Sequence, residues 1–434
     1  MPSVALYTLG CKVSQYETEA VRERFVALGF DVLPSSAPAD VYVINTCTVT
    51  AESDRKSRQA VRRMRSQNPT AVVCVMGCYS QRAPEELVKI GADVVVGTQD
   101  KLMVPELALG VLSGGDGVVR VGDLSGACFE KMKITSAPRT RAYVKIEDGC
   151  EAKCTYCAIS AARGPVRSKA REDVLSEVAE LCRGGVREIV LTGIETGSYG
   201  RDFGGGYGLA DLILDIDAMG VADRIRLGSL APELVGGDFA SKAGRAKALA
   251  PHFHLSMQSG SDTVLARMKR RYTAEMAYRN LEELRKHIRG AAFTTDLMVG
   301  FPGETEQEFL ETVEFVHRVG FISAHVFAYS KRAGTPAAGY RDQVPEAVKR
   351  ERSRALIDVC REVRDGTLLG IVERGEPLSL ILETYDGRGY SAHSGEFAEA
   401  YLEAAPGREG ELVYAMPLSH KDGVILCKEL PSSL

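Results

Sequence analysis

Residues 149–157 read Gly-Cys-Glu-Ala-Lys-Cys-Thr-Tyr-Cys and place three cysteines, Cys150, Cys154 and Cys157, within eight positions. The nearest histidine in the sequence is His252, so no fourth ligand stands close by. A structural zinc site normally closes its tetrahedron with four protein ligands. Thiolates also suit iron–sulfur clusters, and three thiolates on a four-iron cluster leave one iron open. We interpret these cysteines, the core triplet, as a metal site with a free position, which favours an enzyme.

The core triplet directly follows the first of six expected strands. The strands cover residues 143–147, 188–192, 224–230, 253–257, 293–299 and 324–329, with helical patterns at 173–183, 274–288 and 307–319. Strands that alternate with helices indicate βα units around a parallel sheet. Six such units predict a partial (β/α)6 barrel of the TIM type, in which the active site lies on the loops after the strands. The core triplet falls on that face.

The residues before this series show a second α/β pattern. Apolar runs at 4–10, 41–45, 71–77 and 93–97 alternate with helical patterns at 15–28, 51–67 and 82–90. This alternation predicts an N-terminal domain with a parallel sheet over residues 1–110. The Gly-rich stretch 110–126 indicates a boundary, and we assign residues 111–140 to a linker.

The rest of the chain divides into the barrel core, residues 141–366, and a C-terminal part, residues 367–434. Short apolar runs at 378–383, 389–392 and 424–428, separated by Gly and Asp turns, predict a small antiparallel β-barrel. The expected fold class is therefore α/β in three parts, and the length of 434 residues agrees with about three domains.

The composition is that of a large soluble protein, with 45% apolar residues and a net charge of −4. Residues 1–11 have no basic segment before an apolar run, and no stretch is long enough for a transmembrane helix. We therefore expect a cytoplasmic protein without membrane contact. In that compartment, eleven cysteines favour ligands and buried thiols over disulfides.

Three further cysteines, the N-terminal triplet, occupy equivalent places in the first domain. Cys11, Cys47 and Cys78 each follow an expected strand, at spacings of 36 and 31 residues. Parallel strands bring their C-terminal ends to one edge of a sheet, where ligands commonly bind. The thiols could therefore converge on a second cluster. Thr50 could cap the helix after Cys47, whose dipole would favour an anionic cluster. Three buried cysteines without a ligand remain the alternative.

The other five cysteines are expected to be structural or incidental. They are Cys74, Cys128, Cys182, Cys360 and Cys427. Cys74 is ambiguous because it forms a C-x3-C pair with Cys78.

These features together resemble the radical S-adenosylmethionine (SAM) methylthiotransferase family. C-x3-C-x2-C after the first strand of a six-unit barrel is the signature of radical SAM enzymes. Dispersed N-terminal cysteines and a C-terminal β-barrel (TRAM-like) are typical of the methylthiotransferases. Family-like segments occur in order over nearly the whole chain: TLGCKVSQYET (8–18), INTCTVTAESDRKSRQ (44–59), GCYSQ (77–81), LTGIETGSYG (191–200), SMQSGSDTVLARMKRRYT (256–273), DLMVGFPGETEQEF (296–309) and AYSKRAGTPA (328–337). The first three are most similar to the branch that acts on N6-threonylcarbamoyladenosine in tRNA.

The resemblance implies two [4Fe-4S] clusters and SAM as cofactors. The core triplet would hold the cluster that binds SAM and cleaves it to a 5′-deoxyadenosyl radical. The N-terminal triplet would hold the cluster that carries the sulfur. The radical would remove hydrogen from C2 of the adenine and a methylthio group would replace it, with the methyl supplied by a second SAM. No catalytic residue is assigned beyond the cluster ligands.

Six residues are candidates for contacts with SAM: Tyr156, Gly193, Glu195, Ser229, Gln258 and Gly300. Gly193 and Glu195 end the second strand, where this fold tends to bind the amino group of SAM. Ser229 and Gln258 end the next two strands and could reach its ribose or carboxylate. Gly300 opens a Gly-Phe-Pro-Gly loop that would let backbone approach the adenine. Tyr156 lies between two ligands and could pack on the cofactor. Loop hydrogen bonding or core packing are the alternatives for these residues.

Two segments depart from the family pattern. The family usually has Ile-Pro and an aromatic residue before Ala-Arg-Gly, where this chain reads Ile159-Ser160-Ala161-Ala162-Arg163-Gly164. The third strand ends Gly228-Ser229-Leu230-Ala231, where Ser-Ser-Ile-Glu is common. Details of the cluster loop and the substrate pocket could therefore differ, but no cysteine ligand is lost.

Two basic clusters suit a phosphate backbone. The first comprises Arg55, Lys56, Arg58, Arg62, Arg63 and Arg65, with no acid between residues 55 and 65. The second comprises Arg267, Lys269, Arg270 and Arg271. Such patches favour salt-sensitive RNA binding. A solvated helix face is the alternative for each.

The C-terminal part has the opposite charge, with five Lys or Arg against eleven Asp or Glu over residues 371–434. This acidity would suit a basic protein substrate, as in the branch that modifies an aspartate of a ribosomal protein. Because the motifs weigh more than overall charge, our first hypothesis is a methylthiotransferase for N6-threonylcarbamoyladenosine beside the anticodon of tRNA. A methylthiotransferase for isopentenyladenosine tRNA or a ribosomal protein is the second, and a non-enzymatic iron–sulfur or RNA-binding protein the third. We expect a monomer that receives electrons from a flavodoxin- or ferredoxin-like donor.

Overall fold

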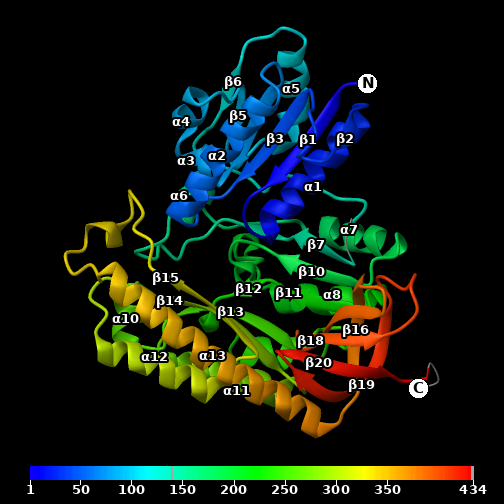
Figure 1. Ribbon diagram of the computed structural model, residues 1–434, viewed down its shortest axis with the longest axis vertical. Coiled ribbons are helices and arrows are strands. Elements are labelled where there is room, and N and C mark those ends of the chain that lie inside the picture. The colour runs from blue at the N-terminus through cyan, green and yellow to red at the C-terminus, as the bar shows by residue number, and fades with distance from the viewer. Residues whose placement is uncertain (138–139, 432–434) are drawn as a thin grey trace.

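The computed structural model describes residues 1–137 and 140–431, which form three parts packed on one another (Figure 1). An N-terminal α/β domain lies above a central α/β core, and a β-barrel lies against one end of the core. The α/β fold class is confirmed, because the first two parts contain parallel sheets and the third is a closed barrel. Within the described residues, no helix has the length and apolar character needed to cross a membrane.

The N-terminal domain contains a six-stranded parallel sheet in the order β2-β1-β3-β4-β5-β6. Its strands are β1 (Ser3–Thr8), β2 (Asp31–Leu33), β3 (Val41–Thr46), β4 (Val72–Gly77), β5 (Val94–Val96) and β6 (Val118–Arg120). Its helices are α1 (Lys12–Ala27), α2 (Ala51–Gln67), α3 (Cys78–Arg82), α4 (Pro84–Lys89), η1 (Lys101–Met103) and α5 (Val104–Leu112). β3 and β4 are buried at every residue, as expected for central strands of a parallel sheet covered on both faces.

Four elements of this domain, β2, β6, η1 and α5, escape prediction from sequence. β2 and β6 are three residues long, too short to show a strand period. α5 contains Pro105 and Gly110, which weaken its helical pattern. β6 pairs with β5 inside the Gly-rich stretch, so the sheet extends past the boundary expected at residue 110. The helix expected at 82–90 is divided, because α3 ends before Ala83 and Pro84 starts α4.

The core is a curved array of parallel strands in the order β7-β10-β11 and then β12-β13-β14-β15. These strands are β7 (Arg141–Lys145), β10 (Glu188–Thr192), β11 (Arg224–Leu227), β12 (Ser229–Leu230), β13 (His252–Gln258), β14 (Ala292–Val299) and β15 (Ser323–Ala328). The strand expected at 224–230 is interrupted at Gly228. Its first half pairs with β10 and its second half with β13, so this segment carries the sheet round the curve of the barrel.

The strand expected at 143–147 is also interrupted, at Ile146. β7 ends at Lys145, and β8 (Glu147–Asp148) instead pairs antiparallel with β9 (Arg167–Ser168). This small hairpin encloses the core triplet, so the cysteines are held at the end of the first barrel strand.

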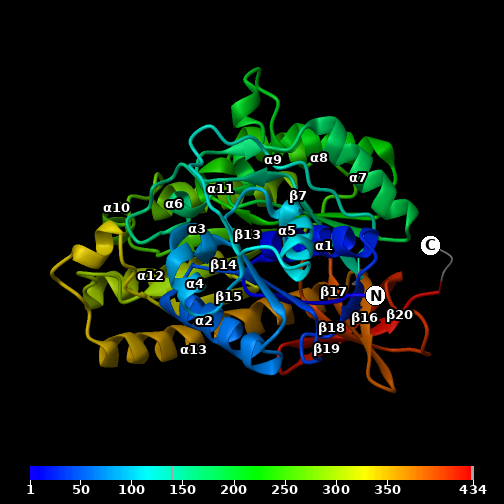
Figure 2. The same ribbon diagram turned by 90° about the horizontal axis from the view of Figure 1, so that it is seen from above.

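Helices cover the outside of the core, except α6 (Ile159–Arg163), which packs against α3 of the N-terminal domain. The others are α7 (Arg171–Arg183), α8 (Leu209–Met219), α9 (Gly237–Ala243), α10 (Asp262–Arg267), α11 (Ala274–His287), α12 (Glu306–Val319) and α13 (Glu346–Arg374), with short 3-10 turns η2 (Thr196–Ser198), η3 (Arg201–Phe203), η4 (Pro232–Leu234) and η5 (Pro336–Gly339). Seen from above, α7, α8, α9 and α11 follow one another round the sheet (Figure 2). The long helix α13 packs on β15 and α12 and continues to the C-terminal barrel.

The C-terminal barrel has five strands in the closed order β16-β17-β18-β20-β19. They are β16 (Leu378–Tyr385), β17 (Gly389–Ser394), β18 (Glu399–Glu403), β19 (Leu412–Lys421) and β20 (Val424–Glu429). The barrel is confirmed, but the expectation that it is wholly antiparallel is wrong, because β18 and β20 pair in parallel. β19 lies between them in sequence, and closure of the ring places β18 beside β20 rather than beside β19.

Candidate active site

The core triplet lies on the loop between β8 and α6. The amide of Cys150 donates to the carbonyl oxygen of Gly164 at 3.0 Å, which fastens the start of the loop to its far end. Gly149 has a φ of +99°, and a Cβ there would stand 1.9 Å from the carbonyl oxygen of Pro165. Only glycine therefore fits before the first cysteine.

The thiols of the core triplet form no disulfide and lie beside hydrogen-bond donors. Arg270 donates from Nη1 to Sγ of Cys154 at 3.3 Å, and the amide of Ile159 donates to Sγ of Cys157 at 3.4 Å. Burial raises the pKa of Cys150 to about 12 and also raises the pKa of Cys157. A metal that binds here must therefore displace thiol protons, and these donors favour the resulting thiolates.

A cavity of about 350 Å³ opens beside the core triplet, between the core and the N-terminal domain. All three cysteines line it, together with residues at the ends of β12, β13, β14 and β15. Val49 and Thr50, which closely follow Cys47 of the N-terminal triplet, line its opposite side. The cavity thus lies on the strand-end face, where the sequence predicts the active site.

Four of the six SAM candidates line this cavity: Tyr156, Glu195, Ser229 and Gln258. Gly193 and Gly300 lie outside its lining and are restricted by other neighbours. A Cβ on Gly193 would stand 2.5 Å from Oε2 of Glu147, and a Cβ on Gly300 would stand 2.4 Å from Cγ of Lys349. Packing therefore requires glycine at position 193, and packing together with a φ of +69° requires it at position 300.

Glu195 is the acidic candidate nearest the core triplet. Its Oε2 lies 3.9 Å from Sγ of Cys150 and accepts a hydrogen bond from the hydroxyl of Ser198 at 2.9 Å. The Glu195 amide donates to Oε2 of the fully buried Glu147 at 2.8 Å, which fixes the backbone. The carboxylate is therefore held at the cavity wall, where it could receive the ammonium group of a ligand.

The N-terminal triplet is assembled by the strand order β1-β3-β4, whose ends adjoin. A Cβ on Gly10, just before Cys11, would lie 3.1 Å from Cβ of Cys47. Burial raises the pKa of Cys78 to about 12, although the charge of Arg163 opposes the shift. Gly10 therefore packs against Cys47, and Cys78 follows the end of the adjacent strand β4. Thr50 caps α2 as predicted, because its side chain accepts a hydrogen bond from the amide of Ser53 at 3.1 Å.

Both triplets offer thiols, the ligand type that iron–sulfur clusters use in proteins. No three His, Cys, Asp or Glu side chains in residues 1–137 and 140–431 form a group that could hold one metal ion. Thiolates on the corners of a four-iron cluster stand farther apart than the ligands of one ion. Each triplet also has an arginine on one sulfur, Arg270 on Cys154 and Arg163 on Cys78, which complements the negative charge of a thiolate-bound cluster.

Comparison with known proteins places these sites in a family. Residues 144–316 match the Radical SAM superfamily, and residues 3–97 match the Uncharacterized protein family UPF0004. The chain is 45% identical to "Threonylcarbamoyladenosine tRNA methylthiotransferase MtaB" of Bacillus subtilis, over 82% of this chain and 80% of that protein. The chain belongs to the radical SAM methylthiotransferase family. The hypothesis of a non-enzymatic iron–sulfur or RNA-binding protein is therefore wrong.

Other relatives agree with this family. The protein of the same name from Thermotoga maritima is 37% identical over 99% of this chain and 97% of its own length. A tRNA-2-methylthio-N(6)-dimethylallyladenosine synthase of Acetivibrio thermocellus is 33% identical over 85% of this chain and 79% of its own length. The solved structure of the radical SAM methyltransferase TsrM from Kitasatospora setae shares the fold, with a TM-score of 0.58 and 16% identity over 78% of this chain and 74% of that one.

In the first basic cluster of this methylthiotransferase, some side chains face solvent and others bond to residues of the same domain. Lys56 and Arg62 are exposed on α2, while Arg55 pairs with Glu52. Arg63 lies over the ring of Tyr7. The other two are tied to the domain itself: Arg58 donates to the hydroxyl of Tyr79, and Arg65 donates to the carbonyl oxygen of Gly91. The solvent-facing part of the cluster therefore centres on Lys56, Arg62 and Arg63.

The second basic cluster is divided by its backbone. Lys269 adopts a φ of +56° and is exposed, as is Arg271. Arg270 instead points into the cavity toward Cys154, and Arg267 pairs with Glu308. Only Lys269 and Arg271 are therefore placed to meet a phosphate backbone from outside the site.

Sequence reasoning missed a polar group on the cavity wall. Asp296 on β14 lies 3.2 Å from Nε2 of His254 on β13 and 3.5 Å from Nδ1 of His325 on β15. Asp296 and His325 both line the cavity. A usable signal was strand alternation: Asp296 and His325 are register partners on β14 and β15, so their side chains lie on the same face of the sheet. Burial lowers the pKa of Lys12, the residue after Cys11.

The other five cysteines lie in apolar cores or near the surface. Cys74 lies fully buried in an apolar cluster of the N-terminal sheet, and Cys360 and Cys427 lie in the cores of the other two parts. Cys128 is exposed and Cys182 is half-buried. The C-x3-C pair of Cys74 with Cys78 therefore does not point to one site, since Cys74 packs among apolar side chains.

Proposed function

We propose that this methylthiotransferase adds a methylthio group to C2 of N6-threonylcarbamoyladenosine beside the anticodon of tRNA, using two [4Fe-4S] clusters. The observation that carries the proposal is the cavity between the core and the N-terminal domain. The core triplet lines it on one side, and the residues that follow Cys47 line it on the other. A base that entered this cavity would have a radical source and a sulfur source within reach. The names of the relatives support the same substrate.

The core triplet would hold a cluster that supplies one-electron cleavage of bound SAM, and the N-terminal triplet a cluster that supplies sulfur. The protein's own side chains orient the reactants. Glu195 would receive the amino group of SAM, since its carboxylate is fixed by Ser198 at the cavity wall. Tyr156 packs edge-on against the buried ring of Phe301 with centroids 6.4 Å apart, which gives the cavity a rigid apolar wall.

One side chain at the cavity, His325, suits the threonylcarbamoyl substrate. That substituent ends in a carboxylate, whereas the isopentenyl group of the second hypothesis is apolar. The hydrogen bond to Asp296 raises the pKa of His325, so this ring at the cavity carries positive charge more readily than a free histidine. The side chain of His325 is 76% exposed, which leaves it open to a substrate anion.

The deciding experiment is mass spectrometry of nucleosides in tRNA from a strain that lacks this gene. We expect 2-methylthio-N6-threonylcarbamoyladenosine to disappear and its unmethylthiolated precursor to accumulate, and a plasmid copy of the gene to restore the product. Loss of the isopentenyl product instead would move the assignment to the second hypothesis. An unchanged tRNA profile together with loss of a methylthiolated aspartate would favour the ribosomal-protein branch, with which the acidic C-terminal barrel is compatible.

Replacing His325 by leucine is expected to raise the KM for an N6-threonylcarbamoyl anticodon stem-loop about two- to fivefold, the effect of one exposed charge pair. SAM cleavage without RNA should stay unchanged, because His325 contacts no cysteine of the core triplet. Steady-state kinetics of reconstituted enzyme would measure both quantities. His287→Leu, a substitution at a partly exposed histidine on α11 that pairs with Glu283, is the matched control. Equal KM values for the two variants and the parent would refute a role for His325 in recognition.

A further inference from the structure

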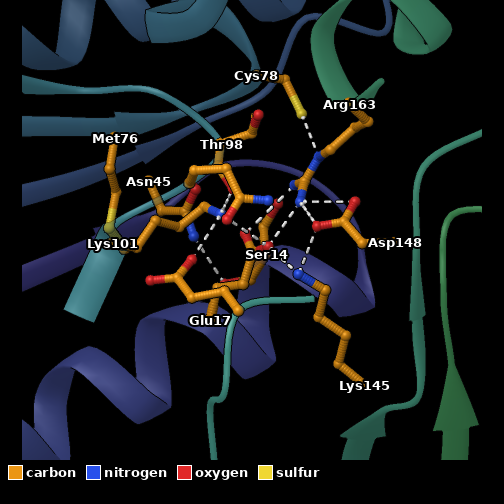
Figure 3. Close-up of polar contacts among 12 residues, drawn as sticks. Ser14, Glu17, Asn45, Met76, Cys78, Thr98, Lys101, Lys145, Asp148 and Arg163 are labelled. Carbon is orange, nitrogen blue, oxygen red and sulfur yellow. Dashed lines mark hydrogen bonds and ion pairs between the residues drawn. The ribbon is translucent and has the colours of Figure 1, made fainter. Parts of the chain in front are cut away.

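A group of buried ions lies between the N-terminal domain and the core, beside the N-terminal triplet (Figure 3). Its centre is Arg163, the last residue of α6, which has no exposed side-chain surface. Arg163 donates from Nε to Sγ of Cys78 at 3.0 Å and from Nη1 to Oε1 of Glu17 at 2.6 Å. It also pairs with Asp148 on β8 at 3.1 Å. One side chain therefore joins the loop of the core triplet to a thiol of the N-terminal triplet.

The ions around Arg163 come from both parts of the chain. Glu17 on α1 accepts from Lys145 on β7 at 2.8 Å and lies 3.2 Å from Lys101. Lys145 also donates to Asp148 at 2.6 Å. Burial alone would raise the pKa of Glu17, but the charges of Arg163 and of the neighbouring lysines hold it well below its usual value. Glu17 is therefore an anion, and the group is an ionic junction between the two domains.

Positive charge exceeds negative charge at this junction. Three cations, Lys101, Lys145 and Arg163, face two fully buried carboxylates, Glu17 and Asp148. The next shell adds one of each sign: Arg167 lies 3.5 Å from Asp148, and Glu130 lies 3.7 Å from Lys101. An uncompensated charge buried in protein costs several kcal/mol. A thiolate at Cys78, in direct contact with Arg163, would supply the missing negative charge.

We propose that Arg163 is a positioning residue of the N-terminal cluster: its Nε–H holds the Cys78 thiolate and raises the reduction potential of the cluster that this thiolate would bind. A hydrogen bond to a ligand sulfur and a nearby cation both stabilise the extra electron of a reduced cluster, so the potential rises. The inference rests on the proposed ligand role of the N-terminal triplet. It adds that the segment after the core triplet sets the electronic state of the second cluster.

The test uses full-length protein in which Cys150, Cys154 and Cys157 are all replaced by alanine, so that only the N-terminal cluster can form. This parent is compared with versions that also carry Arg163→Met or Arg163→Lys. Each is reconstituted without oxygen, its iron and sulfide are counted, and its cluster is titrated electrochemically with detection by electron paramagnetic resonance. We expect a lower midpoint potential in both variants, with the larger shift for methionine, because lysine keeps the charge but loses the Nε–H donor.

Lys101→Met is the matched control, since Lys101 is a buried cation of the same junction that contacts Glu17 but not Cys78. We expect it to lower the unfolding temperature and to lower the midpoint potential less than Arg163→Met does, because Lys101 supplies a buried charge but no hydrogen bond to Cys78. Unchanged potentials in fully loaded Arg163 variants would overturn the inference. So would equal loss of the cluster in all three variants, because the junction would then serve folding alone. Loss in the Arg163 variants only would support positioning of Cys78. A parent that binds no cluster would refute the proposed ligands instead.

Discussion

Replacing Cys78 by alanine is expected to abolish methylthio transfer while SAM cleavage continues, whereas replacing Cys150 is expected to abolish both. Each substitution removes one of three thiols at one of two separate sites. Cys78 begins α3, directly after the end of β4 in the N-terminal sheet. Cys150 begins the loop that follows the first strands of the core. Product formation should fall to background in both variants. Chromatography of 5′-deoxyadenosine and nucleoside mass spectrometry would measure the two activities in the same reaction.

The two variants separate the radical site from the sulfur site because the surrounding structure differs. Cys150 adjoins Glu195, so its loss disturbs both the cluster and the expected seat of the SAM amino group. Cys78 accepts a hydrogen bond from Arg163 and does not line the cavity that holds Tyr156, Glu195, Ser229 and Gln258. Iron content should fall by about half in each variant, since one cluster of two is lost.

Cys74→Ala provides the matched control for Cys78→Ala. Cys74 lies on β4, shortly before Cys78 in the sequence. It is also buried, but it packs among apolar side chains. Its removal should cost roughly 1 kcal/mol of stability through lost packing and leave iron content and both activities intact. If Cys78→Ala still produced the methylthiolated nucleoside, the N-terminal triplet could not be the sulfur site. If Cys150→Ala still cleaved SAM, the core triplet could not be the SAM site.

Local sequence signals predict the positions of both triplets. Gly149 and the C-x3-C-x2-C spacing lie within one loop, and strand periodicity places Cys11, Cys47 and Cys78 at the ends of neighbouring parallel strands. The helix over 51–67 and its Thr50 cap follow from pattern in the same way. These features are predictable because each depends on residues that are close in sequence or that occupy equivalent places in repeated βα units.

Other features depend on contacts between distant residues, which leave no periodic signal. Glu17 and Arg163 lie 146 positions apart, and neither stands out in its own helix. Arg270 reads as a member of a basic run, yet the left-handed backbone at Lys269 turns it into the cavity. The parallel pairing of β18 with β20 follows from closure of the barrel and not from either strand. A run of basic residues in the sequence therefore does not show which of its arginines face solvent.

Replacing Glu188 by glutamine is expected to lower the free energy of unfolding by about 3–5 kcal/mol and to release the C-terminal barrel from the core. Glu188 is fully buried at the start of β10. It accepts hydrogen bonds from Nε of Arg226 at 2.8 Å and from Nη1 of Arg224 at 3.0 Å. Removing its charge would leave buried guanidinium groups without a counter-ion. Urea denaturation and hydrogen exchange of the barrel amides would measure the change.

The two arginines explain why the effect would reach the barrel. Arg226 donates to the carbonyl oxygens of Ser394 and Gly395 at 3.1 and 3.0 Å, and Arg224 donates to the carbonyl oxygen of Ser379 at 2.9 Å. These acceptors belong to or adjoin barrel strands β16 and β17. The charge of Glu188 therefore holds Arg224 and Arg226 in place, and these two arginines fasten the barrel to the end of the core where its strands start.

The same carboxylate predicts the response of the barrel to acid. Burial would raise the pKa of Glu188, but the charges of Arg226 and Arg141 lower it to about 2. A group whose pKa is lower in the folded protein stabilises the fold above its unfolded pKa of about 4.3. This contribution should be lost as the pH falls from about 4.3 toward 2, and Glu188→Gln should lack that part of the pH dependence.

Glu180→Gln is the control, because Glu180 makes a solvent-exposed ion pair with Lys133 and should contribute little to stability. A second comparison isolates the buried charge. Combining Glu188→Gln with Arg226→Met removes one cation as well as the anion, and should recover part of the lost stability if unbalanced charge is the cause. Should the double variant be as unstable as the sum of the single ones, the loss would come from packing around Phe397, over which Arg226 lies. Equal stability of Glu188→Gln and Glu180→Gln would mean that backbone contacts alone fasten the barrel.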